Sequence, residues 1–398
     1  MLPLAGVRVL DLSNVLAGPF CAYQLALLGS DVTKIEHPDG GDLARRLGAD
    51  KDAAARDMGA SFVAVNAGKR SVTLNLKDPR GKAILLDLVK SADVLVENFR
   101  PGVMTRLGLD FDALREVNPR LVYCSISGFG ANGELSRRPA YDQIIQGMSG
   151  VMSVTGDAGS APLRVGYPVS DTVGGLTAAF GICAALVDAR ATGTGRMLDV
   201  SMLEATLATM GWVVSNYLNA GVEPTPMGNE NFTAAPSGTF RTGEGLLNIA
   251  ANETRQFVSL CELIGRPELA NDERFAARHT RKLHRAELKT EIEAALARDS
   301  AANWEARLLE RGVPAGRVLS VPEVLGHAHL AERGFIREFE GTHDEAPRRV
   351  TRAGFRLNDA DTAPSSPAPT LGAHTHATLA SLGYDEHRIA QLRAEGVI

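Results

Sequence analysis

One aspartate, Asp171, stands where a carboxylate could act as a nucleophile. It lies in segment 165–175, where an extended stretch runs into a small-residue helical pattern at 176–186. A carboxylate at such a junction faces the free N–H groups of the helix and can be held there as an anion. Held in this way, it could attack an acyl group. The alternative is structural, because aspartate is also a common helix N-cap residue.

A second acidic residue, Asp142, follows Tyr141 in segment 138–150. It could cap a helix of its own. It could also supply a second carboxylate near Asp171. The sequence leaves both roles open.

The loop at 13–19, after the first predicted strand, could bind a nucleotide. Glu36 ends the second strand, where an acid that binds a ribose would sit. The loop lacks the three spaced glycines with which a backbone approaches a dinucleotide pyrophosphate, which argues against a nicotinamide cofactor. Its backbone could still hold another nucleotide-bearing group.

Two further patterns indicate structure rather than chemistry. Segment 192–196 follows a helical pattern and precedes a predicted strand at 197–202, so it is interpreted as a helix end with a left-handed residue. The pairs His327/His329 and His374/His376 have no cysteine cluster or acidic third ligand nearby, and we expect no metal site.

The length, net charge and cysteine content are those of an ordinary globular protein. Its 398 residues are too many for one compact core and favour two domains. A net charge of −5 gives no general attraction to nucleic acids or anionic membranes. The four cysteines are far apart in the sequence, as in reduced proteins. We expect a soluble, cytoplasmic protein without a signal peptide or membrane span.

A parallel sheet is predicted for the first 200 residues. Strand patterns at 7–12 and 31–36 enclose a helical pattern that ends near residue 28, and such a βαβ unit implies parallel strands. A helix is predicted at 78–91, and further strands at 71–76, 92–98 and 121–127.

The composition changes after residue 220. Segment 221–236 indicates a long connection. The following stretch, from 239 to about 310, is charged and mostly helical in pattern, and 313–318 indicates a turn into another strand.

Seven short motifs occur in a characteristic order. They are RVLDLS (8–13), VLAGP (15–19), VTKIE (32–36), NAGKRS (66–71), VENFRPG (96–102), TGTGR (192–196) and LGAHT (371–375). In this order and spacing, the chain resembles the class III coenzyme A transferase family, of the carnitine CoA-transferase and formyl-CoA transferase type. The resemblance covers nearly the whole chain.

The resemblance implies a fold and a reaction. The expected fold is α/β: a Rossmann-like large domain with a parallel sheet, formed by 1–220 and 313–398, and a smaller α+β domain at 221–312. Two chains would interlock as a homodimer. The expected reaction transfers CoA from an acyl-CoA thioester to a small carboxylic acid, with CoA as a substrate and no other cofactor.

The resemblance also implies site residues. It places the nucleophile on Asp171, which would form an aspartyl intermediate, and active-site positions on Tyr141 and Asp142. The positions implied for CoA contact are Val15, Leu16, Ala17, His37, Lys77, Asn98, Phe99 and Arg106. Segment 228–238 replaces the run of four glycines that closes over the site in formyl-CoA transferase.

Three interpretations of function are weighed, with transfer first. Acyl-CoA racemases on the same scaffold carry a histidine where this chain has Tyr141, and a tyrosine, with a pKa of about 10, is a poor base at neutral pH. A non-catalytic protein that binds CoA or a nucleotide is the third. Arg45 and Arg46 could bind the second carboxylate of a diacid acceptor.

Overall fold

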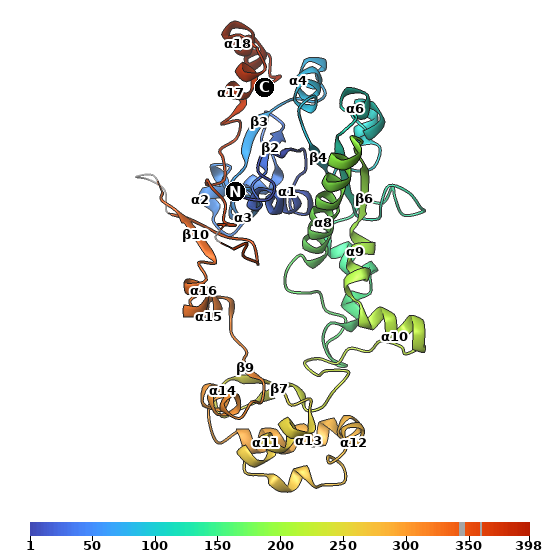
Figure 1. Cartoon of the computed structure of the whole chain (residues 1–398), viewed down its shortest axis with the longest axis vertical. Helices are drawn as coiled ribbons and strands as arrows, with labels where there is room; N and C mark the ends of the chain where they lie inside the picture. Colours follow the sequence, from blue (N-terminus) through green and yellow to red (C-terminus); the bar gives the residue numbers. More distant parts are fainter. Residues whose placement is uncertain (342–346, 359) are drawn as a thin grey trace. The chain divides into compact units, whose positions relative to one another are not determined.

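The computed structural model describes residues 1–341, 347–358 and 360–398. Their contacts divide the chain into two compact units (Figure 1). Unit 1 comprises residues 1–151, 164–222 and 329–398, and unit 2 comprises residues 152–163 and 223–328. Unit 2 thus extends past the boundary expected at 312. The reason is that strand β9 (Ala315–Arg317) pairs with strand β8 (Leu246–Ala250) of the same unit.

Unit 1 is built around a six-stranded parallel sheet with the order β3-β2-β1-β4-β5-β6. The strands are β1 (Arg8–Asp11), β2 (Asp31–Glu36), β3 (Arg70–Thr73), β4 (Val94–Glu97), β5 (Val122–Ser127) and β6 (Met197–Ser201). The predicted strands are confirmed, with ends that shift by a few residues. The strand order reverses between β1 and β4. Ligands of doubly wound sheets bind outside the carboxyl ends of the strands at such a point.

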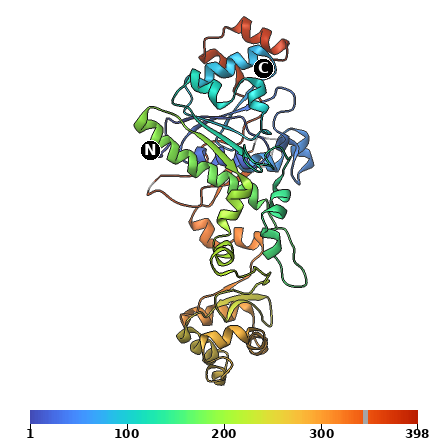
Figure 2. The ribbon, with the colours of Figure 1, turned by 90° about the vertical axis from the view of Figure 1, so that its right-hand side faces the viewer.

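Helices cover both faces of this sheet (Figure 2). Val9 and Leu10 show why: neighbouring strand residues point to opposite faces, and these two belong to different cores. The first core is closed by α1 (Ala17–Leu27) and α8 (Val169–Thr192), and the second by α4 (Pro79–Val89), α6 (Phe111–Val117), α17 (Thr375–Ser381) and α18 (Glu386–Ala394). Both faces are therefore buried, as a parallel sheet requires.

The remaining elements of unit 1 are short. They are η1 (Leu43–Arg46), α2 (Lys51–Ala55), α3 (Ala60–Asn66), α5 (Val103–Leu107), α7 (Asp142–Met148), α9 (Met202–Thr209), α10 (Trp212–Ala220), α16 (Ala328–Glu332, at the boundary), β10 (Ile336–Phe339) and β11 (Arg348–Thr351). The short helix η2 (Val151–Val154) begins at the last residue of this segment of unit 1 and continues in unit 2. Strands β10 and β11 pair as an antiparallel hairpin.

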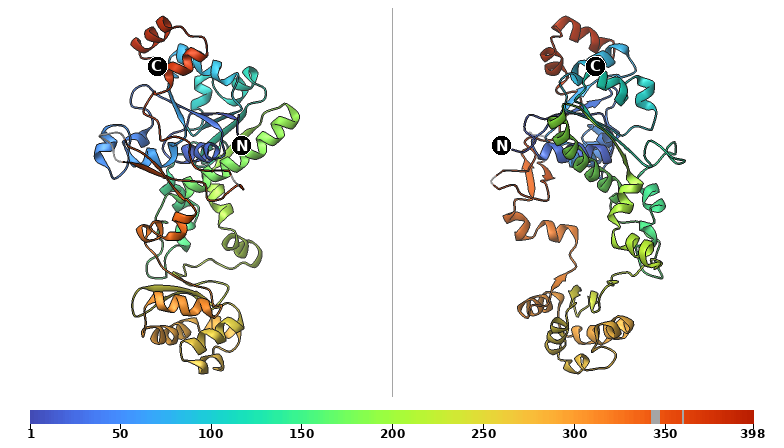
Figure 3. Two further views of the ribbon diagram at one scale, coloured as in Figure 1. Left: turned by 60° about the vertical axis from the view of Figure 1, so that its left-hand side comes forward. Right: turned by 45° about the vertical axis from the view of Figure 1, so that its right-hand side comes forward.

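The C-terminal segment lies beside residues 71–75 of the N-terminal part of unit 1 (Figure 3). The Asn75 N–H donates to the Val397 carbonyl, and the Ser71 N–H donates to His374 Nδ1. Ile398 packs in the same core as α4. The C-terminal segment is thus an integral part of unit 1.

Helix α8 is long and apolar, although the sequence predicted no membrane span. It has 24 residues, and an 18-residue window has a mean hydropathy of 1.6, enough by length and composition to cross a membrane. In this structure, 44% of that window is buried. Because Ala178, Ile182 and Leu186 pack into the first core, α8 serves here as a core helix of the α/β unit.

Unit 2 has a three-stranded antiparallel sheet, β7-β8-β9, with β7 at Ser237–Arg241. Its helical elements are α11 (Thr254–Leu263), η3 (Pro267–Ala270), α12 (Arg278–Leu283), α13 (Arg285–Leu296), α14 (Ala301–Glu310) and α15 (Val321–Leu325). As expected, the stretch from residue 239 to about 310 is mostly helical, but it begins with strands β7 and β8, which were not predicted. Phe240, Leu247 and Ile249 point into the core while Asn248 is exposed, which is the two-residue period of a strand.

Candidate active site

Two neighbouring cavities open where strands β1 and β4 end. The Asp171 cavity, of ≈ 280 Å³, is lined by Val15, Leu16 and Ala17 after β1, by Asn98 and Phe99 after β4, and by Tyr141 and Asp171. The Lys77 cavity, of ≈ 320 Å³, contains His37, Lys77 and Arg106. Asn14 and Phe99 border both. The structure therefore brings the predicted residues together at the reversal point of the sheet, where ligands are expected.

The Lys77 cavity combines apolar walls with cationic groups. Ile35, Leu74 and Val103 line it beside Lys77 and Arg106. No partner for either cationic side chain occurs in the described part of the chain. His37 is exposed, and its Nδ1 accepts the Asp39 N–H at 3.1 Å. An apolar slot with positive charge at its edge suits a base with attached phosphates.

The loop after β1 is fixed by two side chains from other loops, Asn98 after β4 and Asp42 before η1. Asn98 accepts the Asn14 N–H and donates to the Asn14 carbonyl, both at 2.8 Å. Asp42 accepts the Val15 N–H at 2.9 Å. Val15 has a φ of 67°, which is costly for a β-branched residue. Such strain persists only where the surroundings impose it, and here these bonds do so.

A buried charge network lies beneath this loop. Lys69 Nζ donates to Asp11 Oδ2 at 2.8 Å, and Lys34 Nζ pairs with Asp42 at 2.9 Å. Burial alone would raise the pKa of Asp11, but Lys34 and Lys69 bring it down to about 2. Burial lowers the pKa of Lys69 to about 8, although Asp11 opposes the shift. The loop that lines the Asp171 cavity thus rests on a rigid polar base.

Asp171 does not cap helix α8. The N-cap is Pro168, the described residues 155–168 directly before the helix contain no strand, and Asp171 lies in the first turn. The amides at the start of α8 are instead bound by Asp142, whose Oδ1 accepts the Ser170 N–H at 2.8 Å and the Asp171 N–H at 3.2 Å. The expected cap role thus falls to Asp142, which serves a helix other than its own.

The Asp171 carboxylate is not held as an anion, contrary to the sequence prediction. Burial, and then the charge of Asp142, raise its pKa from 3.8 to about 7. No hydrogen-bond donor reaches this carboxylate within residues 1–341, 347–358 and 360–398. A carboxylate without donors keeps its electron pairs free to attack an acyl carbon.

Close packing of α1 against α8 brings Asp171 to the β1 loop. Gly175 lies one turn after Asp171 on the same face of α8, and a Cβ there would come within 2.6 Å of the Ala17 carbonyl oxygen. Only a glycine lets the two backbones approach this closely.

We expect Gly175→Ala to push α1 and α8 apart. The clash with backbone outweighs the better helix propensity of alanine, so the free energy of unfolding should fall by about 1–3 kcal/mol and kcat should fall with it. Gly181→Ala is the matched control on the same helix, because its Cβ would meet only the tip of the Leu198 side chain, at 2.5 Å. Urea unfolding and turnover measure both effects. Equal stability losses in the two variants would contradict this assignment.

Comparison with known proteins agrees with this geometry. The family model described as CoA-transferase family III matches residues 4–375. This chain belongs to CoA-transferase family III. It is accordingly a CoA-transferase, which transfers CoA to carboxylic acids.

Relatives and a solved structure resemble the chain over most of its length. Succinyl-CoA:glutarate CoA-transferase of Mus musculus is 35% identical over 403 residues, covering 100% of this chain and 91% of the relative. Acetyl-CoA:oxalate CoA-transferase of Acetobacter aceti is 41% identical, covering 84% and 85%. A CAIB/BAIF family protein of Brucella suis has a solved structure with 34% identity and a TM-score of 0.85, covering 96% and 99%. The α/β fold with its six-stranded sheet and smaller antiparallel sheet matches that structure.

Arg45 and Arg46, the two residues expected to bind a diacid, are occupied elsewhere in this CoA-transferase. Arg45 is fully buried, and its guanidinium forms two 2.7 Å bonds to Glu36. Glu36 is likewise buried and borders the Lys77 cavity, and both of its carboxylate oxygens accept hydrogen bonds from Arg45. Arg46 donates to the Gly40 carbonyl at 2.8 Å. Neither arginine lines the Asp171 cavity, so the expectation was wrong.

Sequence reasoning missed four residues of the site. Arg100 and Arg138 line the Asp171 cavity, Asp42 holds Val15, and Gln146 bonds to Asp142. Two were detectable. Gln146 lies four residues after Asp142 on a predicted helix, where the side chains meet, and Arg100 directly follows Phe99 at a strand end. Asp42 could not be found, because its contact depends on how two loops meet in space.

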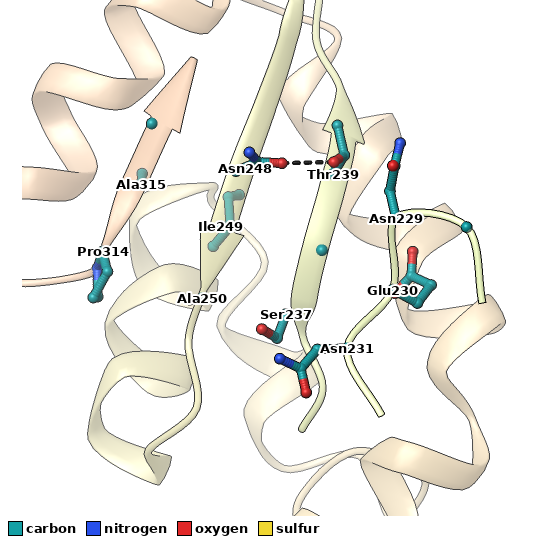
Figure 4. A pocket seen from close by; sticks show the side chains of 13 residues that line it. Asn229, Glu230, Asn231, Ser237, Thr239, Asn248, Ile249, Ala250, Pro314 and Ala315 are labelled. Atoms are coloured by element: carbon teal, nitrogen blue, oxygen red, sulfur yellow. Dashed lines mark hydrogen bonds between the residues drawn. The ribbon is translucent and has the colours of Figure 1, made fainter. Parts of the chain in front are cut away.

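Segment 228–238, which replaces the glycine run, is anchored within unit 2. Glu230 pairs with Lys289 at 2.6 Å, and Arg285 donates to the Asn231 carbonyl at 2.9 Å. Together with the exposed face of β7 and β8, the segment borders a cavity of ≈ 590 Å³ that includes Thr239 and Asn248 (Figure 4). These anchors restrain the segment, and its expected role as a lid stays a prediction.

Two secondary interpretations can be compared with the structure. Gly193 ends α8 in the left-handed conformation with a φ of 73°, which confirms the helix-end interpretation. Histidines 374 and 376 contact Ser71 and Glu386, respectively. Within the described ranges, no cluster of three or more potential metal ligands is present.

Proposed function

We propose that this enzyme transfers CoA from an acyl-CoA thioester to a dicarboxylic acid through covalent intermediates on Asp171. The observation that carries the proposal is the placement of Asp171. It lines a cavity at the reversal point of the sheet, it has no hydrogen-bond donor in the described structure, and its pKa is raised to about 7. Near neutral pH a substantial fraction of the carboxylate is thus ionised and poorly solvated.

The proposed chemistry runs in four steps. The Asp171 carboxylate attacks the thioester carbonyl, the C–S bond breaks, and a mixed anhydride and CoA thiolate form. The thiolate then attacks the aspartyl carbonyl, which releases the donor acid and leaves an aspartyl-CoA thioester. The acceptor carboxylate attacks that thioester, and the released thiolate attacks the acceptor side of the new anhydride. Product leaves as acyl-CoA and Asp171 is regenerated.

CoA would extend across both cavities in this proposal. Lys77, Arg106 and His37 would contact its phosphates and nucleotide in the Lys77 cavity. Val15, Leu16, Ala17, Asn98 and Phe99 would guide the pantetheine arm to Asp171, beside Tyr141. Asn14 and Phe99 border both cavities, which supports one continuous ligand. CoA enters as a substrate, and we propose no resident cofactor.

The acceptor is proposed to be a dicarboxylic acid. The relatives named above act on glutarate and oxalate, which both carry two carboxylates. Arg100 and Arg138 line the Asp171 cavity. No acidic partner is found for either guanidinium in the described part of the chain. One carboxylate would react while an arginine bound the other, replacing the role first expected of Arg45 and Arg46.

We further propose that the enzyme is a cytoplasmic, interlocked homodimer. Phe180 and Val187 on α8 are 78% and 72% exposed, and Trp212 and Leu218 on α10 are 77% and 72% exposed. Large apolar side chains this exposed on two helices favour burial against a protein surface. A second copy of the chain is the simplest occupant.

The substrate assignment is tested by mixing the enzyme with succinyl-CoA and a panel of acids, followed by mass spectrometry of the CoA esters. Dicarboxylic acids should yield new CoA thioesters at least about tenfold faster than monocarboxylic acids of equal chain length, since a charge-assisted bond contributes about 1.5–3 kcal/mol. Racemisation of a 2-methylacyl-CoA without any CoA transfer would overturn the proposal.

Arg100→Gln and Arg138→Gln should raise KM for the diacid and leave KM for a monoacid unchanged. Arg137→Gln is the matched control, because Arg137 is exposed and does not line the cavity. A rise in KM for acyl-CoA instead of the acid would assign the arginines to the phosphates of CoA.

A further inference from the structure

Gln146 is a buried amide whose polar atoms are directed at the start of helix α8. Its Nε2 donates to Asp142 Oδ2 at 2.6 Å and to the Tyr167 carbonyl at 3.3 Å. Its Oε1 accepts the Val165 N–H at 2.9 Å. The side chain is fully buried. One amide therefore joins α7 to the segment that leads into α8.

Asp142 passes this restraint on to the turn that carries the nucleophile. While Oδ2 is held by Gln146, Oδ1 accepts the N–H groups of Ser170 and Asp171. The anion at the positive end of α8 is thus Asp142 and not Asp171. Amides that would otherwise be free to bind the Asp171 carboxylate are occupied.

We propose that Gln146 is a positioning residue for catalysis: it holds Asp142 on the α8 amides, and this keeps Asp171 oriented towards its cavity and free of hydrogen bonds. The inference rests on the proposed nucleophilic role of Asp171. Gln146 itself touches no substrate and acts only through Asp142.

The charged surroundings of Asp171 determine how the pH profile should respond. Asp142 faces it from α7, while Tyr141, Arg100 and Arg138 share its cavity. Only the Asp142 contact depends directly on Gln146. When Gln146 is removed, Asp142 can leave the α8 amides, which then donate to Asp171 and stabilise its ionised form. The rising limb of the plot of kcat/KM against pH should move to lower pH. The plateau of kcat/KM should fall, because Asp171 is no longer oriented towards its cavity.

Gln146→Leu, Gln146→Glu and Gln143→Leu form the test set, with Gln143 as the exposed control on the same helix. For Gln146→Leu we expect kcat to fall about 10- to 100-fold, as for a nucleophile displaced by about 1 Å. Its pH limb should shift down by roughly one unit or more, and KM for acyl-CoA should change little. Gln143→Leu should match the wild type.

Gln146→Glu separates positioning from folding. A protonated glutamic acid can still donate to Asp142 and accept from Val165, whereas an ionised one repels Asp142. Both enzymes need ionised Asp171, so the activity of this variant relative to the wild type at the same pH should be highest at low pH and should fall as the introduced carboxyl ionises. Circular dichroism at each pH monitors the fold. Folded variants that keep the wild-type pH profile would overturn the inference. The proposed function is tested separately. If a trapping reagent labels Asp171 during CoA transfer by the wild type, the covalent mechanism is supported, whether or not the Gln146 variants behave as expected.

Discussion

Asp171→Asn is expected to lower kcat for CoA transfer by roughly 10⁴-fold or more, because the amide cannot form the anhydride or the aspartyl thioester. Binding of CoA should persist, since the groups proposed to hold it line the cavities independently of this carboxylate. Steady-state assays of each variant measure kcat, and isothermal titration calorimetry with CoA measures binding. Asp188→Asn is the matched control, at a half-exposed position on the same helix, where Asp188 pairs with Arg196.

Trapping distinguishes a nucleophile from a residue that only supports the site. Hydroxylamine or borohydride added during turnover should modify Asp171 in the wild type, and peptide mass spectrometry locates the label. A wild-type enzyme that turns over while Asp171 stays unlabelled, or an Asn variant with normal kcat, would exclude the covalent mechanism.

The same substitution should stabilise the fold at neutral and higher pH. The pKa of Asp171 is raised in the folded state, so the unfolded chain ionises more readily, and stability is lost as the pH rises from 3.8 to about 7. Asparagine stays neutral. Asp171→Asn should therefore gain about 1–3 kcal/mol above pH 7, after allowance for partial solvent access, and nothing below about pH 4. Thermal unfolding at both pH values measures this difference. Below pH 7, wild-type kcat/KM should fall with the ionised fraction.

Arg45→Met is expected to lower the free energy of unfolding by about 3–5 kcal/mol, since it leaves the buried Glu36 carboxylate without its partner. Arg46→Met should cost less than about 0.5 kcal/mol, because Arg46 and its partner Asp57 are both well exposed, at 47% and 42%. Arg46→Met therefore serves as the control for Arg45→Met at the neighbouring position. Urea unfolding measures both, and similar losses would contradict the buried pairing.

The pH dependence of this loss has a defined sign. Burial would raise the pKa of Glu36, but Arg45 and Lys34 hold it below its ordinary value of 4.5. The pair therefore stabilises the wild type above about pH 4.5, and this contribution is lost as the pH falls through the folded pKa. The difference between wild type and Arg45→Met should shrink in acid.

Local sequence patterns were enough to predict the parallel sheet and several of the helices that pack on it. Val9 and Leu10 belong to a short apolar run, and the buried strands of a parallel sheet have that signature wherever they lie in the chain. Strand β8 was missed because its short alternation stands among charged helical segments. The family resemblance, which rests on motif order, implied the residues that gather at the ends of β1 and β4.

The charge state and environment of each acidic or basic group required the tertiary structure. Sequence neighbours Arg45 and Arg46 look alike, yet one is buried against Glu36 and the other faces solvent. Asp171 and Asp142 each lie in the first turn of a helix, yet only Asp142 accepts hydrogen bonds from the N–H groups at the start of α8. The sequence by itself determined the family, the parallel sheet and the candidate nucleophile, because these depend on local periodicity and motif order. Which carboxylate is ionised, and which is left without donors, was decided by packing, because burial and hydrogen-bond partners arise only where distant segments meet.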